Sequence, residues 1–167
     1  MSKPETLPPS PARLFPQRAF TLLSPSLSVT SQIDESALEL AVRAGFRLVI
    51  CNRPDGEEAG QLASTVLAQR AELLGIDFLS IPVRPGRFPE QAVVAFRKAV
   101  AGAGGPVLAY CRSGTRSASL AALATADKTD PERSIRAIEA AGYDLSQVRA
   151  WLNRPEKEPG AIAGSGS

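Results

Sequence analysis

The sequence predicts an α/β protein with a mostly parallel central sheet of about four to five strands and helices on both faces. Short apolar runs typical of strands alternate along the chain with segments whose apolar residues recur at helical spacing. Turns that contain glycine or proline separate these segments, and the sequence shows no internal repeat. Alternating strands and helices form crossover units, which place the strands parallel and the helices on the two faces of the sheet.

The first half of the chain contains four predicted strands and two predicted helices. A Ser-Pro turn separates two short strands at 20–23 and 27–30. Asp34 can cap a helix that ends at Gly45, because apolar residues follow Asp34 at helical spacing. The remaining elements of this half are a buried strand at 47–51, a polar loop at 52–58, an amphipathic helix at 61–74 and a strand at 78–81 that Pro82 breaks.

The second half is predicted to be mainly helical. Proline stands in the first turn of a helix at 89–101, where its missing N–H group costs nothing. An apolar strand at 107–110 leads into a helix that begins near Arg116. Two further helices, at 131–141 and 145–153, complete the predicted fold.

We expect one folded domain at 19–153, flanked by two tails. Residues 1–18 carry prolines at positions 4, 8, 9, 11 and 16, which prevent a helix and favour an extended, flexible tail. Residues 154–167 contain Pro155 and Pro159 and end in glycine and serine, which predicts a second flexible tail. A length of 167 residues fits this single-domain organisation.

The composition excludes several classes of function. A net charge of +2, from basic residues that are scattered along the chain, does not favour binding to nucleic acid. No apolar run approaches the length of a membrane span, and the N-terminal residues lack the apolar segment of a secretory signal. Two cysteines without framework spacing fit a reducing compartment, so we expect a cytoplasmic protein.

The chain contains no histidine, which narrows the possible chemistry further. Catalytic triads that use histidine and histidine-based zinc sites are excluded, and two cysteines are too few for a structural zinc site. We therefore expect neither a metal nor an organic cofactor. A catalytic cysteine would have to be activated by the electrostatics of its surroundings.

The candidate active residue is Cys111, which begins the sequence CRSGTRS. This segment follows the predicted strand at 107–110 and precedes a predicted helix, so its backbone N–H groups can bind an anion. The same field favours the thiolate of Cys111. A buried structural cysteine would also fit the end of a strand. The candidate residues that support a functional loop are two arginines, a glycine suited to close backbone approach, and three hydroxyl side chains: Arg112, Ser113, Gly114, Thr115, Arg116 and Ser117.

Three separated segments resemble one bacterial family. They are LVICNRPDGEE at 48–58, IPV at 81–83 and PVLAYCRSGTRSA at 106–118. Together they resemble the phosphatase-like domain of the beta-lactamase hydrolase-like proteins, and CRSGTRS also resembles the active loop of rhodanese-type sulfurtransferases. The resemblance extends over about 20–152. It implies the fold of the cysteine phosphatases (phosphotyrosine phosphatase II-like, similar to the dual-specificity enzymes), in a domain that occurs alone or fused to a sulfur-dioxygenase-type metallo-β-lactamase domain.

Two details of the sequence favour sulfur transfer over phosphate hydrolysis. Cysteine phosphatases use a C-x5-R loop, whereas Cys111 and Arg116 form C-x4-R, which is one residue shorter. We expect a tighter cradle, better suited to a sulfane sulfur. The dual-specificity phosphatases also keep an acidic residue after the strand that corresponds to 78–81, and this chain has no carboxylate there before Glu90.

The sequence-based hypothesis is a rhodanese-type sulfurtransferase that uses Cys111 to carry a persulfide. Its substrate would be a small sulfur anion such as thiosulfate, or a persulfide, and its acceptor a thiol. The first alternative is a phosphatase that forms a phosphoenzyme on Cys111, with Arg116 binding the phosphate. The second alternative is a non-catalytic sulfur-relay or binding module for a sulfur-dioxygenase partner.

The loop at 52–57 is the second candidate part of the site. It could be no more than a solvated turn, because Pro-Asp-Gly is favourable turn chemistry. As a functional loop, it offers Arg53 to bind substrate oxyanions and either Asp55 or Glu57 to hold Arg116 in a bidentate pair. Asp55 is also the replacement acid for phosphatase chemistry. Cys51 could be a resolving thiol, although its apolar neighbours favour a small core residue.

Overall fold

A five-stranded sheet forms the centre of the molecule in the computed structural model, which describes residues 20–126 and 129–155. Its strands are β1 (Thr21–Ser24), β2 (Leu27–Thr30), β3 (Leu48–Cys51), β4 (Asp77–Ser80) and β5 (Val107–Tyr110). The spatial order is β1-β2-β5-β3-β4. Only the β1–β2 hairpin pairs in antiparallel fashion, and all other neighbours are parallel. The predicted mostly parallel sheet is thus confirmed.

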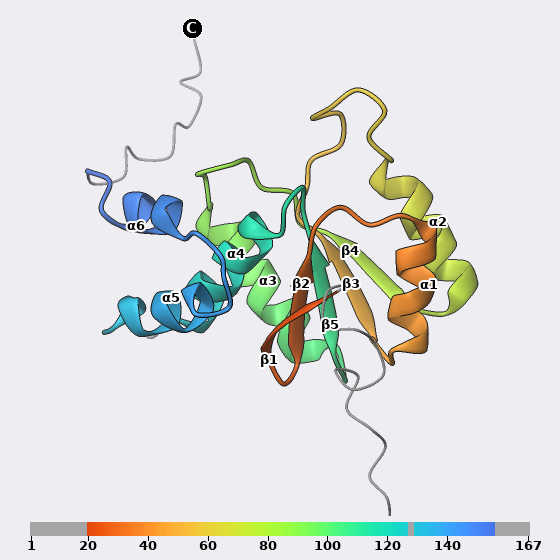
Figure 1. The fold of residues 1–167 in the computed structure, drawn as a ribbon, viewed down its shortest axis with the longest axis horizontal. Helices are drawn as coiled ribbons and strands as arrows, with labels where there is room; N and C mark the ends of the chain where they lie inside the picture. The colour runs from red at the N-terminus through yellow and green to blue at the C-terminus, as the bar shows by residue number, and fades with distance from the viewer. Residues whose placement is uncertain (1–19, 127–128, 156–167) are drawn as a thin grey trace, which may run out of the picture.

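Six helices cover the two faces of this sheet (Figure 1). Helices α1 (Glu35–Arg43) and α2 (Ser64–Leu74) lie on one face. The other four helices lie on the opposite face: α3 (Glu90–Gly102), α4 (Thr115–Thr125), α5 (Pro131–Glu139) and α6 (Ser146–Leu152). Among the described residues, no helix has the length and apolar character that crossing a membrane requires.

Alternation along the central strands divides the core into two clusters. In β5, Val107 and Ala109 face the cluster under α3–α6, whereas Leu108 and Tyr110 face the cluster under α1 and α2. All four are essentially inaccessible to solvent. A parallel strand that is buried on both faces reads as a continuous apolar run, which is why β5 and β3 were recognisable in the sequence.

The structure corrects the predicted boundaries in a few places. The helix expected at 61–74 begins only at Ser64, and the strand expected at 78–81 occupies Asp77–Ser80. The helix expected at 131–141 ends at Glu139, where a turn leads to α6. Most of the two predicted tails, at 1–18 and 154–167, lies outside the described residues.

Candidate active site

Cys111 lies immediately after the central strand β5, at the carboxyl edge of the sheet. Its side chain is completely buried, and its Sγ accepts a hydrogen bond of 3.1 Å from the backbone N–H of Gly114. Gly114 is the N-cap of α4 and has a φ of +93°, a conformation that disfavours residues with a Cβ. Four residues, 111–114, therefore connect a buried strand to a helix whose positive end lies at the sulfur.

Arg116 stands in the first turn of α4 and is buried. Its Nη1 and Nη2 groups each donate a 2.8 Å hydrogen bond to one carboxylate oxygen of Glu57, and Nη1 also donates to the carbonyl oxygen of Val83 at 2.9 Å. A guanidinium has five N–H groups, so Nε–H and one Nη2–H have no partner in the described part of the chain. These two N–H groups share one edge, which matches two oxygens of an oxyanion.

Glu57 holds two buried arginines at once. Its Oε1 atom accepts from Nη2 of Arg116 at 2.8 Å and from Nε of Arg53 at 3.0 Å. Its hydrogen bonds with Arg116 and Arg53 lower the pKa of this carboxyl, against the opposing effect of burial. The sequence offered Asp55 or Glu57 as the bidentate partner of Arg116. In the structure, Glu57 forms this pair.

Arg53 lies beside this pair and also lines a pocket that adjoins the Cys111 loop. Its side chain is 3% exposed, and three of its N–H groups donate to Glu57, to Glu58 at 3.1 Å and to the amide oxygen of Gln32 at 3.0 Å. Binding of substrate oxyanions by Arg53 stays a prediction. Its contacts are those of a residue that positions Glu57 and, through Glu57, Arg116.

Asp55 is used in local structure. Its two carboxylate oxygens accept from the backbone N–H and the hydroxyl of Ser64, each at 2.8 Å, at the start of α2. The expected pair between Asp55 and Arg116 is absent from the described hydrogen bonds. This cap also explains why α2 begins at Ser64 and not three residues earlier.

Ser117 and Asn52 connect α4 to the neighbouring strands. The hydroxyl of Ser117 donates to Oδ1 of Asn52 at 2.8 Å, and Nδ2 of Asn52 donates to the carbonyl oxygen of Ile81 at 2.9 Å. Both side chains are completely buried. The expected role of Ser117 as a donor to the thiolate or substrate is thus replaced by a structural bond. The sequence placed Asn52 in the candidate loop at 52–57 but did not predict this role, because its partners are distant along the chain.

The remaining loop residues lie at the surface. Arg112 is exposed and contacts Glu58 at 3.5 Å, and the hydroxyls of Ser113 and Thr115 lie 3.1 Å apart. A pocket of about 510 Å³ adjoins this side of the loop and is lined in part by Gln32, Arg112 and Glu58. These side chains can meet the part of a substrate that extends beyond the buried sulfur.

Cys51 has the character of a core residue. It faces the cluster under α1 and α2, and its Sγ donates to the carbonyl oxygen of Arg53 at 3.3 Å. Burial raises the pKa of this thiol, which makes it a poor nucleophile at neutral pH. Both cysteines are free, and no cluster of three metal-ligating side chains occurs among residues 20–126 and 129–155.

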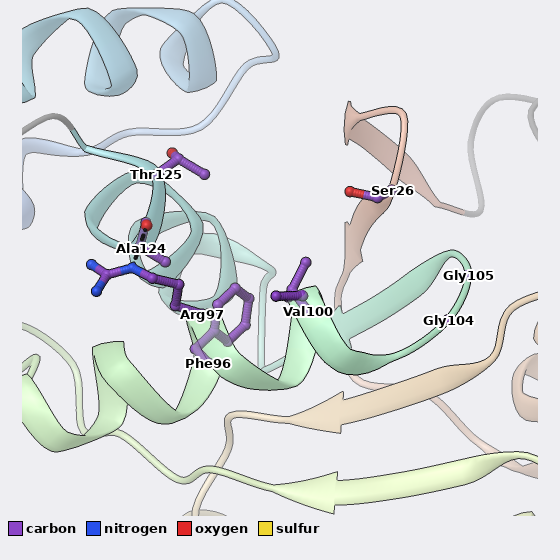
Figure 2. Close-up of a pocket in the computed structure, with 9 residues that line it drawn as sticks. Ser26, Phe96, Arg97, Val100, Gly104, Gly105, Ala124 and Thr125 are labelled. Carbon is purple, nitrogen blue, oxygen red and sulfur yellow. Dashed lines mark hydrogen bonds between the residues drawn. The ribbon is translucent and has the colours of Figure 1, made fainter.

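A second pocket, of about 460 Å³, lies at the opposite end of the sheet (Figure 2). Ser26 and the Gly104–Gly105 turn border it, together with Phe96, Arg97 and Val100 of α3. Nε of Arg97 donates to the carbonyl oxygen of Ala124. The described residues that line this pocket include no cysteine and no carboxylate side chain.

Comparison with known proteins identifies the family of this chain. Residues 19–128 match the family model for the "Beta-lactamase hydrolase-like protein, phosphatase-like domain". The chain belongs to this family. A beta-lactamase hydrolase-like protein of Agrobacterium fabrum is 39% identical over 114 residues, which is 66% of this chain but only 26% of that relative. The chain thus spans about a quarter of the length of this curated relative.

Solved structures relate the family to the cysteine phosphatases. A Neisseria meningitidis protein described as a candidate phosphatase is 33% identical, with a TM-score of 0.70 over 81% of this chain and 96% of its own. A kinase-associated phosphatase with its catalytic cysteine substituted shares the fold at 16% identity, with a TM-score of 0.62 over 75% of this chain and 83% of its own. The expected cysteine-phosphatase fold is confirmed.

These findings change the order of the functional hypotheses. The sequence hypothesis placed sulfur transfer first and a phosphatase second. The family and the Neisseria protein both carry a phosphatase-like description, so the second hypothesis is the better supported. The domain is phosphatase-like.

Proposed function

We propose that this domain is a cysteine-dependent phosphatase that acts on small phosphate monoesters with good leaving groups. One observation carries the proposal. The Cys111 sulfur lies beside the Gly114 N–H at the start of α4, while two N–H groups on one edge of Arg116 have no partner among the residues that the structure describes. A thiolate and an oxyanion-binding fork at one helix terminus are the two groups that phosphoryl transfer to cysteine needs.

In the first step, the Cys111 thiolate attacks phosphorus in line with the ester oxygen. The S–P bond forms as the P–O bond breaks, and the leaving group departs with the electron pair. Nε–H and Nη2–H of Arg116 bind two of the phosphoryl oxygens and stabilise their charge in the transition state. Glu57 keeps this guanidinium in one orientation, so little reorganisation is needed during the reaction.

In the second step, water attacks phosphorus and the S–P bond breaks. Inorganic phosphate leaves, one proton of the water passes to solvent or to the phosphate, and the Cys111 thiolate is regenerated. The same field at the α4 terminus stabilises the thiolate as a leaving group. The two steps together consume one water and require no metal or redox partner.

The choice of substrate follows from the carboxylates around the site. Glu57 is paired with Arg116, Glu58 with Arg53, and Asp55 with Ser64. The segment 82–89 contains no carboxylate. A general acid accelerates ester cleavage by about a hundredfold or more, and alkoxides depend on it most. We therefore expect efficient cleavage of aryl phosphates and slow cleavage of alkyl phosphates.

The test compares an aryl phosphate with an alkyl phosphate, using the full chain and the Cys111→Ser variant. We expect aryl phosphate hydrolysis that is lost in Cys111→Ser, with a preference for the aryl ester of about a hundredfold. Absence of hydrolysis, or hydrolysis that survives in Cys111→Ser, would overturn the proposal.

Sulfur transfer is the second candidate, supported by the short C-x4-R loop and the absence of a free acid. The Cys111 thiolate would attack the sulfane sulfur of thiosulfate, the S–S bond would break, and sulfite would leave with the electron pair. Cyanide would then take the sulfur as thiocyanate. Thiocyanate formation that depends on Cys111, without hydrolysis of aryl phosphate, would make this the function. Inactivity in both assays would favour the relay or binding module.

A further inference from the structure

We infer that Tyr143 is a positioning residue that holds the backbone amide of Gly114 against the sulfur of Cys111. A Cβ atom built on Gly114 would lie 3.0 Å from Cε1 of Tyr143 and 3.1 Å from its hydroxyl oxygen. The carbonyl carbon of Thr30 closes the same space at 3.4 Å. The phenol ring therefore packs directly on the glycine whose N–H donates to Sγ.

The turn between α5 and α6 gives Tyr143 a fixed position. Gly142 has a φ of +101°, which reverses the chain just before the tyrosine. The carboxylate of Asp144 accepts from the N–H of Ser146 at 2.9 Å, and Leu145 is completely buried. The tight turn at Gly142 and the buried side chain of Leu145 therefore fix the position of Tyr143 along the chain.

Ion pairs fix the two helices that carry this turn. Arg149 of α6 binds Glu132 and Glu139 of α5, with Nε 3.1 Å from Glu132 and Nη2 2.9 Å from Glu139. Ile135 and Ile138 of α5 belong to the same core cluster as Leu120 and Ala121 of α4. The α5–α6 unit therefore has a defined position against the helix that begins at the active loop.

The effect on reactivity passes through a single hydrogen bond. The N–H of Gly114 is the one donor to Cys111 Sγ among the described hydrogen bonds. A hydrogen bond to the charged form of a group favours that form, so a displaced Gly114 would favour the neutral thiol. Without the ring of Tyr143, the space beside Gly114 opens and the loop can relax into it.

Tyr143 lies beyond residues 19–128, the part that matches the family model. The inference rests on Cys111 as the nucleophile of the proposed function, but it does not depend on whether the substrate carries phosphorus or sulfur.

The test measures alkylation of Cys111 by iodoacetamide as a function of pH in the full chain. The sulfur–carbon bond forms as iodide leaves, and the mass of the Cys111 peptide separates this reaction from any at Cys51. For Tyr143→Ala, we expect the ratio of the alkylation rate at neutral pH to the rate at alkaline pH to fall by about threefold or more, because the hydrogen bond to the thiolate is weakened. Tyr143→Phe keeps the ring on Gly114 and should restore the wild-type ratio.

Val148→Ala is the matched control, because Val148 is buried in the core beside the same unit. The atoms nearest to the Gly114 Cβ position belong to Tyr143 and Thr30, so this variant should leave the ratio of the two rates unchanged. A wild-type ratio in Tyr143→Ala, or an equal fall in Val148→Ala, would overturn the inference. Alkylation needs no substrate, so a failed phosphatase assay would leave this test intact.

Discussion

Glu57 connects the two buried arginines of the site, and this connection sets the geometry of the anion-binding group. Both arginines would be unfavourable in the interior without a partner. Because one carboxylate receives Arg116 on both oxygens and Arg53 on one, the free edge of Arg116 has a fixed direction. Catalytic geometry and local stability therefore depend on the same side chain.

Glu57→Gln tests this double role. The substitution keeps the shape of the side chain but leaves Arg116 without a carboxylate partner and Arg53 with Glu58 alone. We expect the free energy of unfolding to fall by about 2–3 kcal/mol, since breaking a partly buried pair costs somewhat less than a fully buried one. Misplacement of Arg116 should lower kcat/KM for an aryl phosphate by about ten- to a hundredfold.

Urea denaturation and steady-state kinetics provide the measurements, with Glu58→Gln as the control. The side chain of Glu58 is 54% exposed, so its ion pairs should contribute only about 1 kcal/mol or less. Equal stability and activity of Glu57→Gln and wild type would show that the pair does not position Arg116.

At the scale of the elements, the loop from β3 to α2 supplies two carboxylates with different contacts. One binds the N-terminus of α2, and the other holds Arg116. Asp55 caps α2, whereas Glu57, two residues later, turns back toward Arg116. The two carboxylates thus have separate tasks within one turn.

Asp55→Ala distinguishes a cap from a catalytic acid. Loss of a cap costs about 1 kcal/mol, so the variant should be slightly less stable and should keep its phosphatase activity. Asp34→Ala is the matched control, because Asp34 caps α1 through a 2.8 Å bond to the N–H of Ala37. If Asp55→Ala alone loses activity by about a hundredfold, Asp55 is the general acid and the assignment as a cap is incomplete.

Local patterns predicted most of the elements and the two central site residues. Apolar periodicity located β3 and β5, and the spacing of Cys111, Gly114 and Arg116 predicted the loop on a helix terminus. The start of α2 was placed too early because its cap is supplied by Asp55, nine residues upstream of Ser64. A cap from outside the first turn leaves no local signal.

Other features depend on the path of the chain in three dimensions. The sequence offered both Asp55 and Glu57 as partners of Arg116, and only the folded loop distinguishes them. Tyr143 gave no sign of contact with Gly114, because the two lie in different elements and the contact follows from how α5 and α6 pack. Contacts of this kind are tertiary and cannot be derived from periodicity.

At the scale of the whole molecule, the α5–α6 unit packs against the loops that follow β4 and β5, at the end of the sheet where Cys111 lies. Trp151 of α6 packs edge-on against Phe88, with ring centroids 6.2 Å apart, while Tyr143 reaches Gly114. The unit therefore contacts both the loop after β4 and the loop after β5. Within the unit, Arg149 of α6 forms ion pairs with Glu132 and Glu139 of α5.

These ion pairs predict sensitivity to acid. Hydrogen bonds from Arg149 lower the pKa values of Glu132 and Glu139 below the ordinary 4.5, and those from Arg116 and Arg53 lower that of Glu57. A carboxyl whose pKa is lower in the folded protein stabilises it above the unfolded pKa, and this contribution is lost as the pH falls. The thermal midpoint should therefore decrease between about pH 5 and pH 3.

Arg149→Gln is the comparison for the acid series. Without the guanidinium, Glu132 and Glu139 should return toward ordinary pKa values, so the decrease at low pH should be shallower than in wild type. Parallel curves for the two proteins would show that the α5–α6 ion pairs do not contribute to the acid sensitivity.

The central claim is that Cys111 accepts a phosphoryl group. It is tested most directly by mixing the full chain with an aryl phosphate, quenching within the first turnover and measuring the mass of the Cys111 peptide. The account predicts a gain of one phosphoryl group on Cys111, absent from Cys111→Ser. An unmodified Cys111 during continued hydrolysis of the aryl phosphate would contradict it.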